Sequence, residues 1–246
     1  FIEGMADAVR VANGGFYGEK DRPKGGHYMN GYRHAGYFFV WIRDNYDADF
    51  LRKFNQSTLH VVPWSFDGAI KSILGEEHDI ESLWHEYQVA VGDILIGYPS
   101  DGFHANGWSL GRRVLAQNPD LLTEAELRDL LAPTRLYHDV VYDMRKLGIT
   151  PKAYAHITGG GLPENLERFL GEKGADLEIP YWDNAPAQKV LQFVDAEDRF
   201  HTFNMGIGWV AIVSPDQVEQ ALTAGPGGTV IGTMREGKGI HVKVRK

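Results

Sequence analysis

The stretch over residues 101–107, Asp-Gly-Phe-His-Ala-Asn-Gly, carries side chains that can do chemistry. His104 can transfer a proton near neutral pH or donate a hydrogen bond to an oxyanion, and Asn106 offers both a donor and an acceptor. The stretch follows an apolar run and precedes a helical pattern, a position where free main-chain N–H groups attract anions. The alternative is a turn in which Asp101 and Asn106 only cap main-chain groups. The spacing leaves both interpretations open.

A second candidate site lies in residues 156–161, His-Ile-Thr-Gly-Gly-Gly, again between a strand pattern and a helix pattern. Gly159, Gly160 and Gly161 have no Cβ, so their main-chain N–H groups can approach a ligand closely. Phosphate is the usual occupant of such a loop. The alternative is a flexible turn, although three glycines directly before a helix are costly unless a ligand uses them.

Three further stretches are suited to binding. Residues 203–209, Phe-Asn-Met-Gly-Ile-Gly-Trp, alternate glycine on a strand pattern, which indicates either another backbone lying close or the core of a tight sheet. Gly14-Gly15 with Glu19 could form part of a nucleotide–magnesium site, because Glu is a hard oxygen ligand; a turn that ends a helix is the alternative. Arg135, one turn into a helix predicted to begin at Pro133, could pair with a carboxylate or a phosphate, with a surface ion pair as the alternative.

Two familiar motifs are incomplete. Residues 232–238 have the spacing of a phosphate-binding loop, but Gly239 stands where a Ser or Thr hydroxyl is needed, so we predict a hairpin turn there. His85-Glu86 resembles the start of a zinc-protease helix, yet residue 89 is Val and the second ligand is missing. The sequence therefore predicts neither of these two sites.

Hydrophobic periodicity and turn residues predict the elements that position these stretches. Strand and helix patterns interleave without a strict βαβ repeat, which predicts an α+β fold with a mixed sheet and helices packed on it. The predicted strands are residues 35–41, 91–98, 152–157, 205–213 and a hairpin of 229–234 with 240–244; the predicted helices are 2–12, 108–116, 123–130, 133–147, 162–170 and 215–222.

Composition limits the classes of function. The chain has 246 residues, a formal charge of −8 and no cysteine, which argues against a broad nucleic-acid-binding surface, a disulfide scaffold and Cys-ligated metal sites. No apolar run approaches the roughly 18–20 residues that span a bilayer. We therefore expect a protein with no nucleic-acid partner and no membrane contact, and the lack of cysteine is compatible with a reducing cytoplasm.

Five motifs in one order resemble the C-terminal half of the phosphoribosylformylglycinamidine cyclo-ligase family, the aminoimidazole ribonucleotide synthetases of purine biosynthesis. They are residues 91–97, 101–110, 132–137, 155–165 and 202–208. The resemblance implies that residues 89–246 form the C-terminal, substrate-binding domain of the aminoimidazole ribonucleotide synthetase-like superfamily. Residues 1–8 resemble a helix of that family's N-terminal domain. We therefore expect residues 1–41 to be a remnant of the ATP-binding domain and residues 42–88 an atypical, mostly helical insert.

The resemblance implies an ATP-dependent ligase that closes the imidazole ring of aminoimidazole ribonucleotide from formylglycinamidine ribonucleotide. It implies catalytic roles for His104 and Asn106, and ribonucleotide binding by Asp101, by residues 158–161 (Thr158, Gly159, Gly160 and Gly161) and by Asn204. Glu19 is the expected cofactor-binding residue, with ATP and Mg²⁺ as cofactors and no metal ligands assigned. A cytoplasmic homodimer is expected for the complete enzyme.

The chain departs from the family in three ways. The family's Gly-Gly-Glu-Thr stretch is changed around Gly14-Gly15, residues 42–88 replace a short connection with a much longer one, and we expect the family's N-terminal nucleotide-binding loops to be absent from this chain. We therefore expect the chain to be only part of the enzyme, inactive alone but able to bind a ribonucleotide phosphate. The alternatives are a sister enzyme, such as selenophosphate synthetase, thiamine-phosphate kinase or the hydrogenase-maturation dehydratase, and a non-catalytic substrate-binding module.

Overall fold

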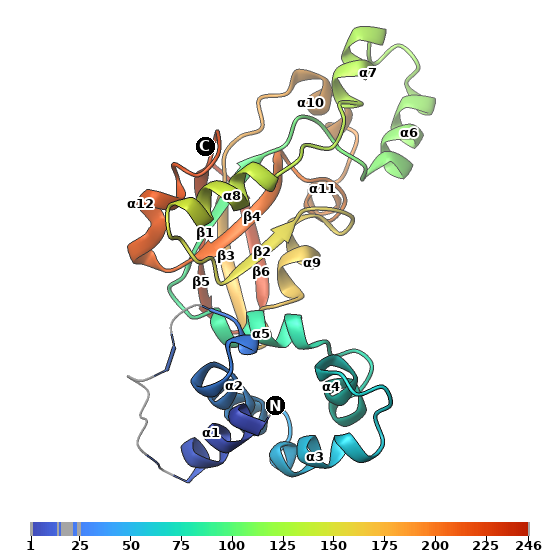
Figure 1. Cartoon of the computed structure of the whole chain (residues 1–246). Helices are drawn as coiled ribbons and strands as arrows, with labels where there is room; N and C mark the ends of the chain where they lie inside the picture. Colours follow the sequence, from blue (N-terminus) through green and yellow to red (C-terminus); the bar gives the residue numbers. More distant parts are fainter. Residues whose placement is uncertain (1, 14, 16–21, 24–25, 246) are drawn as a thin grey trace. The chain divides into compact units, whose positions relative to one another are not determined.

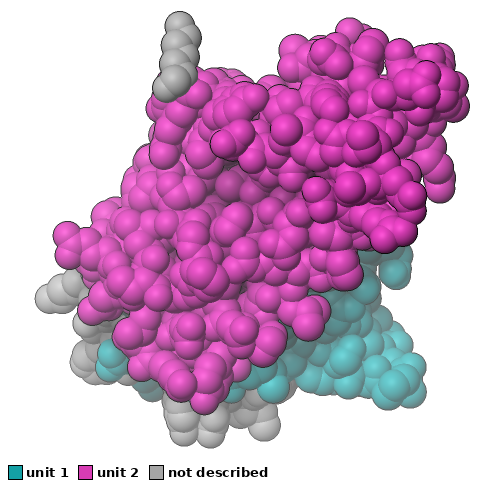
Figure 2. All heavy atoms as spheres, turned by 90° about the horizontal axis from the view of Figure 1, so that it is seen from above, with its two compact units in different colours: residues 1–88 teal, residues 89–246 magenta. Residues whose placement is uncertain are grey.

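The computed structural model describes residues 2–13, 15, 22–23 and 26–245. The chain forms two compact units, residues 1–88 and residues 89–246, which Figure 2 colours separately. The contact pattern places both predicted N-terminal segments, residues 1–41 and 42–88, in the first unit. None of the described helices is long and apolar enough to cross a membrane.

The described part of the first unit is helical, and its core is rich in aromatic rings. The core includes Phe38, Phe39, Phe54 and Trp84. The helices are α1 (Ile2–Ala12), α2 (Tyr32–Asn45), α3 (Phe50–Gln56), α4 (Phe66–Leu74) and α5 (Ile80–Gln88), with 3₁₀ turns η2 (Tyr28–Asn30) and η3 (Ser57–Leu59).

The strand predicted for residues 35–41 is wrong, because these residues lie inside α2. The run is apolar on consecutive positions, so periodicity alone does not separate a buried strand from a helix buried on several sides. Small residues let α1 and α2 pack closely: a Cβ on Gly36 would lie 2.8 Å from the Asp7 Cβ, and one on Gly4 would lie 2.6 Å from the Ala35 Cβ. This close packing buries Phe38 and Phe39 completely.

The second unit is built on a six-stranded mixed sheet with the order β2-β4-β1-β5-β3-β6. Four of its pairings are antiparallel and the pairing of β3 with β6 is parallel. The α+β fold with a mixed sheet is thus confirmed. The strands are β1 (Ile94–Pro99), β2 (Ala153–His156), β3 (Lys173–Ile179), β4 (Ile207–Val213), β5 (Thr229–Glu236) and β6 (Gly239–Val244). The predicted hairpin of β5 and β6 is wrong, because β3 lies between them.

Helices cover both faces of this sheet (Figure 1). Side chains of α9 and α10 join the larger core on one face, whereas α8 and α12 pack on the other face. The helices are α6 (Trp108–Gln117), α7 (Glu124–Leu130), α8 (His138–Lys146), α9 (Gly161–Glu167), α10 (Ala185–Leu191), α11 (Ala196–Thr202) and α12 (Val218–Ala221), the last following the 3₁₀ turn η4 (Pro215–Gln217). The helix predicted from residue 133 begins only at His138, and residues 133–137 are not helical.

Sheet topology brings the predicted loops together. Both β1 and β2 pair antiparallel with β4, so they run in the same direction and end at the same end of the sheet. β4 begins at that end, preceded by residues 203–206. The register places Tyr98 of β1 and His156 of β2 on either side of Trp209. Three of the predicted stretches therefore meet at one end of the second unit.

Candidate functional site

The loops after β1 and β2 approach each other closely. A Cβ on Gly159 would lie 3.7 Å from the Asn106 Oδ1, so the Asn106 amide faces the glycine loop. Gly159 is exposed and Asn106 is half-buried. The structure therefore brings together the amide and the glycine loop that the sequence predicts as parts of one site.

His104 is held tightly inside the first loop. Its side chain is 4% exposed, and its φ of 61° is unusual for a residue with a side chain. The Nε2 atom accepts hydrogen bonds from the main-chain N–H groups of Asp101 (3.2 Å) and Arg135 (3.5 Å). In the neutral ring the proton therefore resides on Nδ1, which has no hydrogen-bond partner among the described residues.

Burial also sets the charge of this ring. Desolvation lowers the pKa of His104; the Asp101 carboxylate raises that pKa, whereas His156 and Arg135 lower it. A neutral His104 with its proton on Nδ1 is a hydrogen-bond donor. The Nδ1 atom is itself buried in the structure, so both roles that the sequence leaves open for His104 stay predictions.

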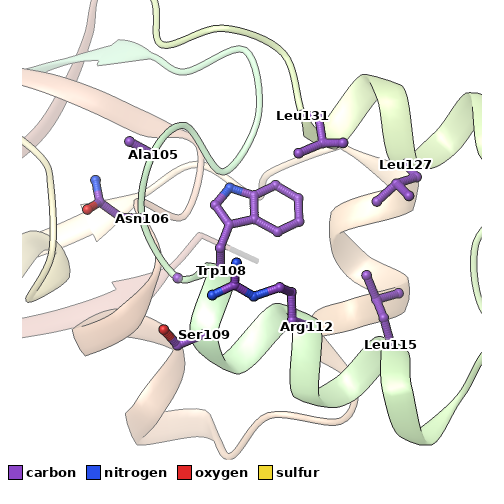
Figure 3. Close-up of a pocket in the computed structure, with 9 residues that line it drawn as sticks. Ala105, Asn106, Trp108, Ser109, Arg112, Leu115, Leu127 and Leu131 are labelled. Carbon is purple, nitrogen blue, oxygen red and sulfur yellow. The ribbon is translucent and has the colours of Figure 1, made fainter.

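A cavity of about 750 Å³ lies beside the same loop, between α6 and α7. Figure 3 shows the Trp108 indole extending toward Leu127 and Leu131, while Asn106 extends from the other side of the loop. The Trp108 ring is fixed by a 2.7 Å hydrogen bond from its Nε1 to the His104 carbonyl. The cavity is therefore lined both by apolar side chains of α6 and α7 and by the Asn106 amide.

The glycine loop is built by one buried side chain, Asn165, which is 2% exposed. Its Nδ2 donates to the carbonyls of Thr158 (3.3 Å), Gly159 (3.2 Å) and Gly161 (2.7 Å), and its Oδ1 accepts from the Thr158 hydroxyl (3.0 Å). The Gly161 N–H donates to the Thr158 carbonyl inside the turn. Among the described residues, the N–H groups of Gly159 and Gly160 make no hydrogen bond, so they are the donors left for a ligand.

Asn204 has the corresponding role under the first loop and is also 2% exposed. Its Oδ1 accepts from the Ser100 hydroxyl (3.0 Å) and the Gly206 N–H (2.9 Å), while its Nδ2 donates to the Gly102 carbonyl (2.9 Å). The side chain predicted to touch substrate thus lies beneath the loop, with its amide engaged by the protein. Asp101, in contrast, keeps a carboxylate that is 52% exposed.

The alternating glycines before Trp209 make room for side chains. A Cβ on Gly208 would collide with the Tyr137 hydroxyl and lie 2.9 Å from the His104 Cε1. Tyr137 donates to the Pro99 carbonyl (2.9 Å), and its ring stacks on Trp209 at 5.6 Å. This close approach is side-chain packing, so of the two interpretations of residues 203–209 the core of a tight sheet is the one observed.

Two residues at this end were not predicted as site residues or were placed differently. Arg135 lies in the extended segment before α8, with its guanidinium 3.9 Å from Asp101 and 3.4 Å from the Pro99 carbonyl. His156 ends β2 and is exposed, and its ring packs on Tyr137 and Trp209 at 5.9 Å from each. The sequence signals for His156 are its place at a strand end and within the stretch over residues 156–161, where no role was assigned to it.

The first unit contributes less to the predicted chemistry. Glu19 and Gly14 lie outside the described residues. At the end of α1, the Gly15 N–H donates to the Arg10 carbonyl (2.9 Å), the arrangement of a helix-terminating turn. Within residues 2–13, 15, 22–23 and 26–245, no group of three or more His, Asp or Glu side chains is placed to hold a metal ion.

Two family models match the chain, one for each unit. Residues 1–87 match the family described as a peptidase of plants and bacteria. Residues 90–245 match the family described as AIR synthase related protein, C-terminal domain. The family model that matches residues 1–87 is not one for an ATP-binding domain. The assignment of residues 1–41 to an ATP-binding domain stays a prediction.

Curated relatives of the chain are named as enzymes of purine biosynthesis. The chain is 44% identical over 170 residues to a phosphoribosylformylglycinamidine cyclo-ligase of Caldicellulosiruptor saccharolyticus, covering 61% of this chain and 49% of the relative. It is 38% identical over 173 residues to the human trifunctional purine biosynthetic protein adenosine-3, covering 65% of this chain and 17% of the relative. The chain spans about half the length, or less, of these relatives.

Solved structures are more distant. The hydrogenase maturation protein HypE of E. coli matches with a TM-score of 0.41 and 21% identity, over 65% of this chain and 48% of that one. A thiamine monophosphate kinase from Aquifex aeolicus matches with a TM-score of 0.40 and 18% identity, over 63% and 50%. The family model covers more than half of the residues, so the chain belongs, through residues 90–245, to the AIR synthase related protein C-terminal domain family.

Proposed function

We propose that residues 89–246 form the ribonucleotide-binding half of a phosphoribosylformylglycinamidine cyclo-ligase, an enzyme of purine biosynthesis that forms a C–N bond. The observation that carries this proposal is the meeting of two loops, with the Asn106 amide facing Gly159 at the common end of β1 and β2. The names of the curated relatives support the reaction. The complete enzyme is proposed to act as a cytoplasmic homodimer, as the resemblance implies.

The substrate phosphate is proposed to bind at the glycine loop. The N–H groups of Gly159 and Gly160 supply donors, since Asn165 turns the carbonyls of the loop inward. Gly161 and Asn204 support the loops from beneath, through their contacts with protein groups. Thr158 and Asp101 complete the rim, where the Asp101 carboxylate accepts hydrogen bonds from substrate N–H or hydroxyl groups.

His104 and Asn106 are proposed to act on the formyl amide. Asn106 orients the amide through its donor and acceptor. His104, whose Nδ1 atom is buried and unpartnered among the described residues, is proposed as the hydrogen-bond donor to the oxygen on which charge develops. ATP transfers a phosphoryl group to that oxygen, which turns it into a leaving group. The described residues hold no cluster suited to Mg²⁺, so no step is assigned to a metal here, and Glu19 stays the proposed cofactor-binding residue.

Turnover of ATP and formylglycinamidine ribonucleotide by the complete enzyme tests this proposal. We expect Asn106→Ala to lower kcat by roughly 10²-fold or more, because an orienting or oxyanion-stabilising group contributes on that scale. Asn118→Ala is the matched control, since Asn118 lies at the far end of α6 and its amide only binds the Val114 carbonyl. Normal turnover by a folded Asn106→Ala enzyme would contradict the assignment of residues 101–107 to the active site.

A further inference from the structure

We propose that His156 is the residue that accepts the proton released when the imidazole ring closes. This inference rests on the proposed function, and it assigns a role that the first loop leaves unfilled. Three observations support it: the hydrogen bonds of His104, the packing of His156, and the chemistry of the other charged or titratable side chains nearby.

The buried histidine is a poor proton acceptor. Its Nε2 lone pair already binds two main-chain N–H groups, those of Asp101 and Arg135. Protonation of Nε2 would break both bonds and place a charge on a side chain that is 4% exposed. A group that takes up a proton in each turnover must therefore lie elsewhere.

His156 meets the requirements for that group. It is exposed at the end of β2, two residues before Thr158, and neither of its ring nitrogens makes a hydrogen bond among the described residues. Its ring is held on two sides by Tyr137 and Trp209. Partial burial lowers the pKa of His156, so the imidazole is a neutral base at pH 7.

The other charged or titratable groups that share this end of the sheet are less suitable. The Arg135 guanidinium carries only hydrogen-bond donors and has no lone pair to accept a proton. Tyr137 donates its hydroxyl proton to the Pro99 carbonyl, and burial raises the pKa of this phenol. The Asp101 carboxylate lies 3.9 Å from the Arg135 guanidinium and is engaged with it, and the Glu164 carboxylate of α9 lies against Gly160, at the far side of the glycine loop from the ring of His156. His156 is the neutral imidazole with free nitrogens in this set.

The proposed step balances without a further reactant. An amidine nitrogen attacks the carbon that bears the phosphorylated oxygen, and a C–N bond forms. The C–O bond to the phosphoryl group breaks, and its electron pair leaves with inorganic phosphate. The nitrogen loses one proton, which the His156 imidazole accepts; the imidazolium then returns the proton to water.

Kinetics of the complete enzyme test the assignment. His156→Gln should lower kcat by roughly 10²-fold with KM changed less than about threefold, and added imidazole should restore part of the rate. His241→Gln is the control, because His241 is an exposed histidine on β6, at the opposite edge of the sheet. Unchanged kcat in His156→Gln would overturn the proposal, as would a loss that appears only in KM.

A measurement on this chain alone keeps the proposal testable apart from turnover. Histidine ¹⁵N NMR should show His156 titrating below the ordinary histidine pKa, because partial burial lowers it, and its nitrogens shifting when formylglycinamidine ribonucleotide binds, while His104 keeps its proton on Nδ1. If the ¹⁵N shifts of His156 did not change when the ribonucleotide binds, the inference would be overturned. Absence of any ribonucleotide binding would instead contradict the proposed function, so the two failures are distinguishable.

Discussion

The two loops of the site are each fixed by one buried asparagine, but the bonds differ in kind. Asn204 joins Gly102 and Ser100, about a hundred positions away in the chain, to the start of β4. Asn165 binds only residues four to seven positions before it. The first loop therefore depends on the assembled sheet, whereas the second is formed by its own local sequence.

This difference separates two requirements of the site. The conformation of the glycine loop is set by hydrogen bonds within residues 158–165, which suits a loop that recognises a common group such as phosphate. The loop over residues 101–107 holds its side chains only when β1 and β4 are paired. We expect changes at the two asparagines to separate stability from binding.

The largest expected effect is that of Asn204→Leu. Loss of this amide leaves the Ser100 hydroxyl, the Gly102 carbonyl and the Gly206 N–H without their partner in the core, which should lower the free energy of unfolding of the second unit by about 3 kcal/mol or more. Chemical denaturation followed by Trp fluorescence measures it.

Asn165→Leu is the matched comparison. It should cost less, because the short loop can turn its carbonyls to water, yet it should abolish ribonucleotide binding. Equal losses in the free energy of unfolding from the two substitutions would contradict the distinction between the long-range hydrogen bonds of Asn204 and the local hydrogen bonds of Asn165.

Two glycines of the second loop should behave oppositely. Gly161 has a φ of +60°, and a Cβ there would collide with the Phe200 carbonyl oxygen, so Gly161→Ala should destabilise the unit by about 2 kcal/mol. Gly159 has room for a methyl group at ordinary contact distance from Asn106. Gly159→Ala should keep stability and weaken ribonucleotide binding several-fold.

Calorimetric titration and thermal unfolding of both variants measure these effects. Because the Gly159 methyl group would stand between the loop and the Asn106 amide, only binding should change there. Wild-type affinity in a folded Gly159→Ala chain would contradict the placement of the ligand between the two loops.

Acid should loosen the first loop before the second. The pKa of His104 is lowered by burial, so the unfolded loop, with an ordinary histidine pKa near 6.5, binds more protons than the folded one. The stability contributed by neutral His104 is complete above about pH 6.5 and is lost as the pH falls toward the lowered value.

Hydrogen exchange compares the loops directly. Protection factors of the Asp101 and Arg135 amides, which bind His104, should fall between pH 7.5 and pH 5.5, while that of the Gly161 amide should change little. The difference should disappear in His104→Gln. A parallel loss of protection in both loops would mean that His104 does not control the first one.

Much of the second unit could be predicted because its signals are local. Glycine-rich turns between strand and helix patterns marked residues 101–107 and 156–161, and periodicity located β1, β2 and β4. Strand β3 was missed although Ala175, Leu177 and Ile179 alternate with polar residues and are buried. Its insertion between β5 and β6 is a long-range pairing that no local pattern encodes.

The candidate site shows the same limit. Residue types indicated His104 and Asn204, but only the fold shows that main-chain groups occupy the His104 Nε2 and the Asn204 amide. The importance of Asn165 arises from three carbonyls turned toward one side chain, a geometry that the letters Pro-Glu-Asn do not reveal. In the first unit, consecutive apolar residues of α2 resemble a buried strand, because α1, α3 and α5 pack on different sides of this helix and bury them.

Amide NMR of this chain during titration with formylglycinamidine ribonucleotide tests the central claim most directly. The account predicts shifts that saturate with a dissociation constant on the order of 1 mM, about −4 kcal/mol, and that concentrate at Gly159, Gly160 and Asn106. Ribose 5-phosphate should shift the glycines alone. An absence of shifts at Gly159 and Gly160, or shifts confined to residues 1–88, would contradict the assignment of a ribonucleotide site to the ends of β1 and β2.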